Sequence, residues 1–185
     1  MKSILFLEKY LFRKDILLKI KEFIQKKWRL NFKNEFSDLK KLFHGRDVNI
    51  IFDIGAHIGD TANLYRKHFV NSRIYCFEPY TESYHILKKR FSDNGNIFPI
   101  ELAVGEKEST EKLYFGNYSN LNSLKKPNDR AWGFNKQKTI IVQVTTILDY
   151  CKKNFIDEID ILKIDVQGNE LEVLRGAAEL LKGNK

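Results

Sequence analysis

Three acidic residues, Asp53, Glu78 and Asp165, each end a short apolar or β-rich run. A carboxylate can accept hydrogen bonds from both hydroxyls of a ribose, hold an ammonium group, or take a proton. Ligands of open α/β sheets bind at the carboxyl ends of the strands, near the switch in strand order. The three acids therefore predict a ligand site at one edge of a parallel sheet.

A loop with two glycines follows the first of these acids. Gly55 and Gly59 allow positive φ angles and a close ligand approach, and a helical pattern begins directly after them. A dinucleotide-binding loop would carry its middle glycine where this chain has His57, so the loop suits pyrophosphate poorly. We expect a ligand without phosphate, such as S-adenosylmethionine. A nicotinamide-dependent oxidoreductase is the alternative that His57 disfavours.

The second acid fits a ribose contact. Glu78 lies 25 residues after Asp53, close to the ~20-residue separation at which a ribose-binding acid follows the first strand of nucleotide-binding α/β units. We therefore expect Glu78 to bind ribose, and we interpret Asp165 as a base or as a group that orients the acceptor.

The elements that must hold these acids alternate along the chain. Short links between strands and helices predict right-handed crossovers and a parallel sheet with the first strand innermost. Pro99 predicts that its strand lies at an edge. The expected strands are residues 49–53, 73–78, 97–104, 112–115, 139–145 and 159–165, and the expected helices are residues 60–69, 80–91, 146–154 and 169–175.

Positive charge is concentrated at the N-terminus. Residues 1–44 hold 12 Lys or Arg and 5 Asp or Glu, within a net charge of +8 for the chain. Residues 3–30 are expected to form basic amphipathic helices that pack on the domain or, alternatively, contact an anionic membrane surface weakly. We divide the chain into a helical N-terminal segment (1–46) and a catalytic domain (47–185). Nucleic acid is not an expected partner, and two isolated cysteines favour a cytoplasmic protein.

Five sequence blocks together resemble the FkbM-type methyltransferase family. They are FDIGAHIGDT (residues 52–61), YCFEP (75–79), LAVG (102–105), TILD (146–149) and LKIDVQGNE (162–170). The resemblance implies a class I, Rossmann-like α/β fold that uses S-adenosyl-L-methionine. It also implies methylation of a hydroxyl on a small-molecule acceptor, such as a natural product, or on a sugar or glycan.

The resemblance also assigns roles to individual residues. The cofactor-binding positions it implies are Asp53, Gly55, Ala56, His57, Gly59, Thr61, Glu78, Pro79, Ala103 and Val104. Asp165 is the catalytic candidate, no metal is expected, and the candidate acceptor contacts are Ser119, Asn120, Ser123, Gln167 and Glu170. His57 stands where the family commonly has Asn. Gln167 stands where it usually has Glu, which keeps the hydrogen bonds and removes the charge.

The chain ends one helix after its fourth core strand, whereas a complete class I methyltransferase sheet has seven strands. We therefore expect residues 159–165 to form an exposed sheet edge that favours self-association. An alternative function follows from this shortness: a non-catalytic domain that binds S-adenosylmethionine or a nucleoside and is completed by a partner chain.

Overall fold

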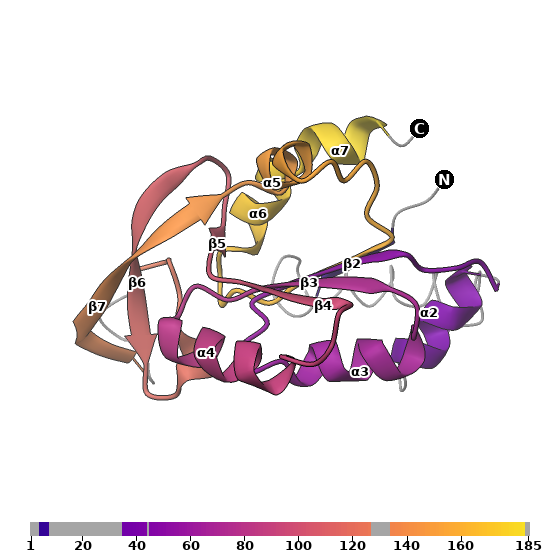
Figure 1. Cartoon of the computed structure of the whole chain (residues 1–185). Helices are drawn as coiled ribbons and strands as arrows, with labels where there is room; N and C mark the ends of the chain where they lie inside the picture. The colour runs from indigo at the N-terminus through magenta and orange to yellow at the C-terminus, as the bar shows by residue number, and fades with distance from the viewer. Residues whose placement is uncertain (1–3, 8–34, 44, 127–133, 184–185) are drawn as a thin grey trace, which may run out of the picture.

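The computed structural model describes residues 4–7, 35–43, 45–126 and 134–183, and Figure 1 shows its helices and strands. In chain order the elements are β1 (Ile4–Leu7), α2 (Glu35–Phe43), β2 (Ile50–Ile54), α3 (Asp60–His68), β3 (Arg73–Phe77), α4 (Thr81–Arg90), β4 (Ile97–Ile100), β5 (Ala103–Val104), β6 (Ser109–Gly116), the 3-10 turn η1 (Ser119–Leu121), β7 (Phe134–Thr145), α5 (Ile147–Lys153), β8 (Ile161–Ile164), α6 (Glu170–Gly176) and α7 (Ala178–Gly183).

The main sheet has five strands in the order β1-β8-β2-β3-β4, and all of its neighbouring strands are parallel. The predicted Rossmann-like α/β class is confirmed, with β2 at the centre. β4 lies at one edge, as Pro99 predicted, because proline has no N–H to donate to an outer neighbour. This order brings the carboxyl ends of β2, β3 and β8 together.

Helices cover both faces of this sheet. Figure 1 shows α3 and α4 below the sheet and α5, α6 and α7 above it. Successive strand residues point to opposite faces. Ile51 therefore packs in the core between the sheet and helices α3 and α4, while Phe52 packs in the core between the sheet and helices α5 and α6. Burial on both faces is typical of parallel sheets and explains the nearly continuous apolar character of β2.

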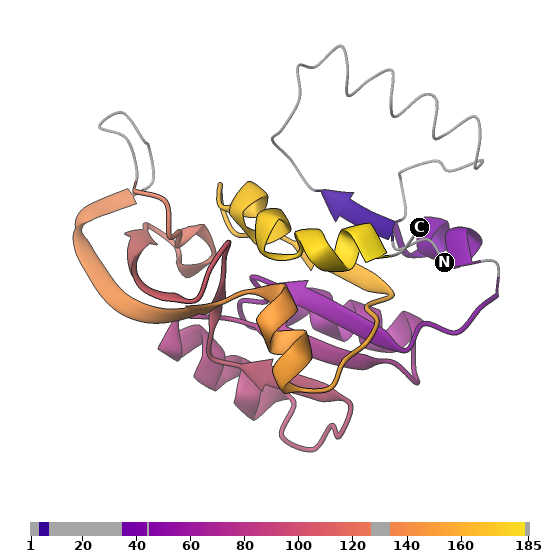
Figure 2. The same cartoon turned by 90° about the horizontal axis from the view of Figure 1, so that it is seen from above.

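The N-terminal residues depart from the prediction. A helix was expected from residue 3, but Ile4–Leu7 form β1, which pairs in parallel with β8 (Figure 2). β8 is therefore not a sheet edge, and the prediction that residues 159–165 form an exposed edge is wrong. Self-association of the chain stays a prediction. A short apolar run is compatible with helix or strand, and the unpaired peptide groups of β8 favour the strand.

The remainder of the N-terminal segment is only partly described. Residues 8–34, which carry most of the predicted amphipathic helix, lie outside the described residues. α2 is helical as predicted, and Phe36, Leu39 and Phe43 pack in the same core as Ile51. Where the structure describes the chain, it contains no helix that is long and apolar enough to cross a membrane. Membrane-surface contact and the boundary near residue 46 stay predictions.

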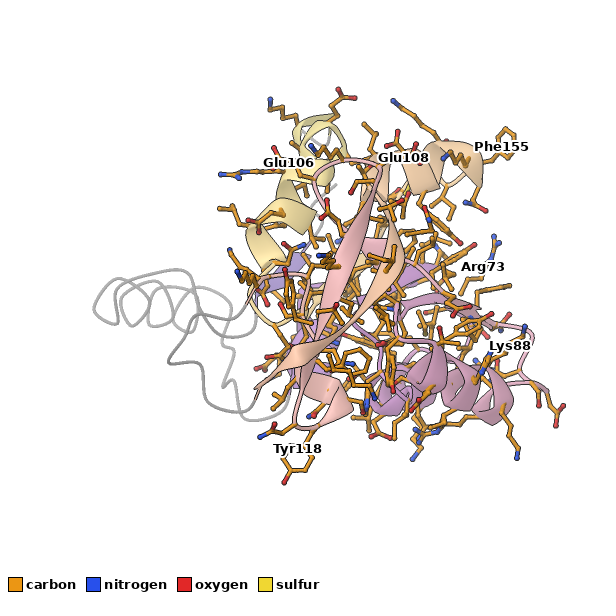
Figure 3. The ribbon with its side chains drawn as sticks, turned by 90° about the vertical axis from the view of Figure 1, so that its left-hand side faces the viewer. Arg73, Lys88, Glu106, Glu108, Tyr118 and Phe155 are labelled. Carbon is orange, nitrogen blue, oxygen red and sulfur yellow. The ribbon has the colours of Figure 1, made fainter. Side chains whose placement is uncertain are left out.

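A second, three-stranded sheet, ordered β5-β7-β6, stands at the end of the parallel sheet. The predicted strand 97–104 is in fact two strands, because β4 pairs with β3 whereas β5 pairs with β7. Figure 3 views the molecule from this end and shows β6 and β7 in front of the parallel sheet, with Tyr118 at the lower side. Residues 117–126, which follow β6, approach the ends of the parallel strands.

Candidate functional site

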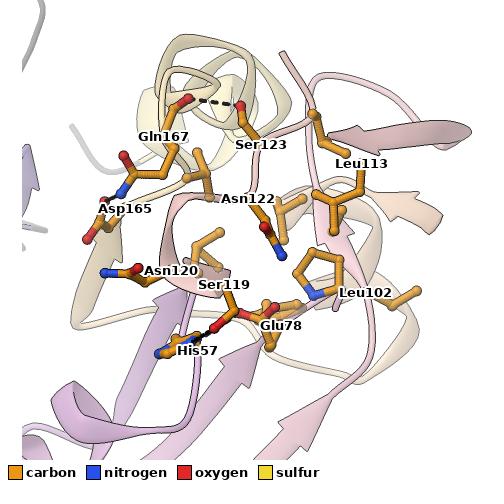
Figure 4. A pocket seen from close by; sticks show the side chains of 18 residues that line it. His57, Glu78, Leu102, Leu113, Ser119, Asn120, Asn122, Ser123, Asp165 and Gln167 are labelled. Atoms are coloured by element: carbon orange, nitrogen blue, oxygen red, sulfur yellow. Dashed lines mark hydrogen bonds between the residues drawn. The ribbon is translucent and has the colours of Figure 1, made fainter. Parts of the chain in front are cut away.

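A hollow lies where the parallel strands end, and the segment after β6 forms its opposite wall (Figure 4). It encloses about 60 Å³, which is room for a few water molecules. Its lining residues are Ile54, Gly55, His57, Phe77, Glu78, Pro79, Leu102, Ala103, Val104, Leu113, Ser119, Asn120, Asn122, Ser123, Leu124, Asp165, Val166 and Gln167. The lining is apolar on one side and carries carboxyl, imidazole, hydroxyl and amide groups on the other.

The loop after β2 requires glycine at two positions. Gly55 has φ +76°, and a Cβ there would lie 2.0 Å from the backbone oxygen of Asp165. Gly59 has φ +87° and precedes the first turn of α3, where a Cβ would meet Leu87 and Phe91 within 2.6 Å. The glycines therefore allow the loop to press against the end of β8 and against α4.

Glu78 is the buried acid of the hollow. Its two carboxyl oxygens accept backbone N–H bonds from His57 and Tyr80, both at 2.9 Å. Burial raises the pKa of Glu78 to about 7, although these two hydrogen bonds oppose the shift. Each carboxyl oxygen has a second lone pair, so the side chain retains the capacity to accept from a ligand hydroxyl.

His57 connects two walls of the hollow. Its Nε2 lies 2.6 Å from the Ser119 hydroxyl of η1 and shares a hydrogen bond with it. Its φ of +50° lies in the left-handed region, which Asn tolerates better than most residues. That backbone geometry suits Asn, the residue that the family resemblance led us to expect at this position. Burial lowers the pKa of His57 below 6.5, while Asp60 opposes the shift.

Asp165 and Gln167 form the third wall. Asp165 is half-buried at the end of β8, and its Oδ1 accepts from Gln167 Nε2 at 3.1 Å. Gln167 has a φ of +55°, and its backbone oxygen accepts from the Ser123 hydroxyl at 2.9 Å. The turn after β8 is thus tied to the segment after η1, with an acid and an amide facing the hollow.

Asp53 occupies a different environment from the one its position predicted. Its side chain is fully buried and forms an ion pair with Lys163, whose Nζ lies 2.9 Å from Asp53 Oδ1 and 3.1 Å from the Gly55 carbonyl oxygen. The two residues are register partners on β2 and β8. Asp53 therefore supports the glycine loop from beneath and does not line the hollow.

Eleven of the sixteen predicted site residues line the hollow together, and Asp53, Ala56, Gly59, Thr61 and Glu170 do not. Ala56 donates its N–H to Phe77. Glu170 accepts at Oε1 from the backbone N–H of Gly168 at 2.9 Å and so stabilises the turn after β8.

Sequence reasoning missed three contributors from β6 and the segment that follows it: Leu113, Asn122 and Leu124. Leu113 and Leu124 supply apolar wall, and Asn122 supplies an amide. The only available signal was that a polar segment, residues 117–126 with three asparagines and two serines, follows a predicted strand.

Comparison with known proteins decides the family. The family model described as Methyltransferase FkbM domain matches residues 53–184, which includes every element from α3 to α7. This chain belongs to the FkbM methyltransferase family. The family resemblance inferred from the sequence blocks is thereby confirmed, and the hollow lies within the matched FkbM domain.

Two curated relatives of this FkbM domain carry methyltransferase names. One is the 2-O-methyltransferase NoeI of Sinorhizobium fredii, 21% identical over 71% of this chain and 58% of the relative. The other is the methyltransferase sdnD of Sordaria araneosa, 26% identical over 70% of this chain and 60% of the relative. The chain thus spans about three fifths of the relatives it matches. No solved structure matches it.

Proposed function

We propose that this FkbM methyltransferase uses S-adenosyl-L-methionine to methylate a hydroxyl group of a sugar, glycan or natural product. The observation that carries the proposal is the Glu78 carboxylate, buried at the carboxyl end of β3 and facing the hollow. A carboxylate in this position suits the two ribose hydroxyls of an adenosyl group. The name of the 2-O-methyltransferase relative supports the hydroxyl class of acceptor.

The residues of the hollow fit such a cofactor chemically. Glu78 offers acceptor lone pairs for ribose, and the apolar Ala103 and Val104 offer surface for a nucleobase. Gly55 lines the hollow in the loop that leads to α3 and leaves that part of the wall without a side chain. The enclosed space of about 60 Å³ is smaller than a nucleoside, so we expect the Ser119–Leu121 turn to move outward on binding.

The acceptor is expected on the side of Asp165. When bound, the cofactor supplies a methyl group on a positively charged sulfur. As the acceptor oxygen forms its bond to that methyl group and the carbon–sulfur bond breaks, the acceptor hydroxyl must lose its proton. Asp165 takes this proton in our proposal, with Gln167 Nε2 holding its Oδ1 in place. A positioned base of this kind contributes about 10²–10⁴-fold to the rate.

Calorimetric titration tests the cofactor. S-adenosylmethionine should bind the wild-type chain and should bind Glu78→Ala at least about 10-fold more weakly, because the variant loses a hydrogen-bonding charged group. Glu101→Ala, which changes an exposed acid that directly follows β4, should bind normally. Absence of binding to a folded wild-type protein would exclude the proposal.

Turnover tests the chemistry. Formation of S-adenosylhomocysteine should follow addition of a hydroxyl-bearing acceptor from a panel of sugars, glycans and polyols. Asp165→Asn should lower the rate constant while leaving cofactor affinity nearly unchanged. Cofactor binding without turnover on any acceptor would favour the alternative of a non-catalytic binding domain.

A further inference from the structure

Asn122, which neither the sequence analysis nor the proposed chemistry uses, follows η1 and points into the hollow (Figure 4). Its Oδ1 accepts from the backbone N–H of Gly116 at 3.0 Å. A backbone N–H can only donate, so this contact requires the oxygen of the amide on that side. The orientation of the amide is therefore determined, and Nδ2 is the atom that remains for another partner.

The Nδ2 group of Asn122 has no hydrogen-bond partner although it is buried. Among the described residues, one other buried side-chain nitrogen shares this condition, Arg66 Nη1, and it does not line the hollow. Leaving a buried donor unpaired is unfavourable, so such groups in native proteins usually serve a ligand or a water. The neighbouring Ser119 and Ser123 hydroxyls, in contrast, are both hydrogen-bonded.

The surroundings of Asn122 indicate which part of a ligand it meets. In Figure 4 Leu113 lies above the amide and Glu78 and Leu102 lie below it, and Asp165 and Gln167 lie across the hollow. Apolar walls suit the faces of an aromatic base, and an amide N–H suits an unprotonated ring nitrogen. The methyl acceptor, which is expected near Asp165, is a less suitable partner for the Asn122 amide.

We infer that Asn122 is a specificity residue that donates a hydrogen bond from Nδ2 to a ring nitrogen of the adenine of the bound cofactor. The inference rests on the proposed function, since it assumes an adenosyl ligand whose ribose lies at Glu78. It adds a nucleobase contact from the segment after η1, so that the wall opposite the ends of the parallel strands also takes part in cofactor recognition.

The test uses calorimetry at one pH with S-adenosylhomocysteine and three analogues in which N1, N3 or N7 of adenine is replaced by C–H. One analogue should bind the wild-type chain about 10-fold more weakly than the parent compound. Asn122→Asp keeps an acceptor for Gly116 but cannot donate, and it should bind the parent compound about 10-fold more weakly. The analogue that binds the wild type weakly should bind Asn122→Asp as well as the parent compound does, because this variant already lacks the hydrogen bond from Nδ2.

Asn117→Asp is the matched control. It makes the same change of charge at an exposed position on the same loop, and its affinities should equal those of the wild type. Thermal unfolding of both variants verifies that they fold.

The outcomes separate the inference from the proposed function. Failure of the wild type to bind any of the four compounds would overturn the proposed function, and this inference with it. Normal binding of S-adenosylhomocysteine with equal affinity for all three analogues would overturn the inference alone, even without a folded variant. An analogue effect that persists unchanged in Asn122→Asp would also overturn it.

Discussion

Replacing Glu78 by glutamine should change how the free energy of unfolding depends on pH. Burial raises the pKa of Glu78 to about 7 in the folded chain, from an ordinary value of 4.5. Between these two values the folded state holds more protons than the unfolded state, so stability falls as pH rises. The contribution of Glu78 is therefore complete below pH 4.5 and is lost as pH rises through 7. At about 1.36 kcal/mol per pKa unit, the loss is about 3 kcal/mol.

Glutamine keeps the size of the side chain and removes its titration. Its oxygen can accept one of the two backbone N–H groups of His57 and Tyr80, while its NH₂ group must face the other. That unpaired N–H destabilises the variant by about 1–3 kcal/mol. At pH 5 the wild type should therefore be the more stable protein. By pH 8 the difference should have shifted by about 3 kcal/mol towards the variant.

Urea unfolding followed by circular dichroism between pH 5 and 8 measures this difference. Taking wild type minus variant removes the contribution of every other group that titrates in both proteins. Glu101→Gln, an exposed acid, should give a difference that is nearly constant over the same range. A wild-type minus Glu78→Gln difference that varied by less than about 0.5 kcal/mol would refute the assignment of a buried, protonated acid.

Three further outcomes follow from contacts described above. Gly55→Ala should lower the free energy of unfolding by about 2–5 kcal/mol, because alanine there would have a positive φ and a Cβ that overlaps the backbone of Asp165. Gly95→Ala, where the Cβ would meet open space, should change the free energy of unfolding little. Lys163→Met should lower stability by about 3–5 kcal/mol by leaving Asp53 buried without its ion pair, and adding Asp53→Asn should restore part of the loss in a double-mutant cycle. Deleting residues 1–7 should expose the edge of β8 and raise the apparent mass in sedimentation velocity at high protein concentration, and a monodisperse monomer would contradict this.

The arrangement of the parallel sheet followed from the sequence because its signals are local. Apolar runs that end in an acid or a glycine marked β2, β3 and β8, and short links with right-handed crossovers ordered β2, β3 and β4. Proline at residue 99 correctly indicated an edge. These features depend on properties of neighbouring residues, which a single sequence contains.

The N-terminal strand could not be predicted, because what makes Ile4–Leu7 a strand is the edge of β8, more than a hundred residues later in the chain. The place of Asp53 was missed for a similar reason. Its position after a strand suggested a ligand contact, whereas its pairing with Lys163 depends on which strand lies beside β2. Asn122 was missed for a local reason: its side chain turns back to Gly116, six residues earlier, and this contact leaves one amide donor unpaired, which no sequence pattern indicates.

The pairing of β1 with β8 affects the order in which the protein can mature during synthesis. Ile4 leaves the ribosome before every other described element, yet its partner Ile161 emerges only when nearly all of the described chain has been made. Pairing between such distant segments forms slowly, because a long loop must close first. Of the described strands, β1 is translated first and is therefore expected to dock last. Until it does, the growing sheet presents an open edge to chaperones and to neighbouring nascent chains.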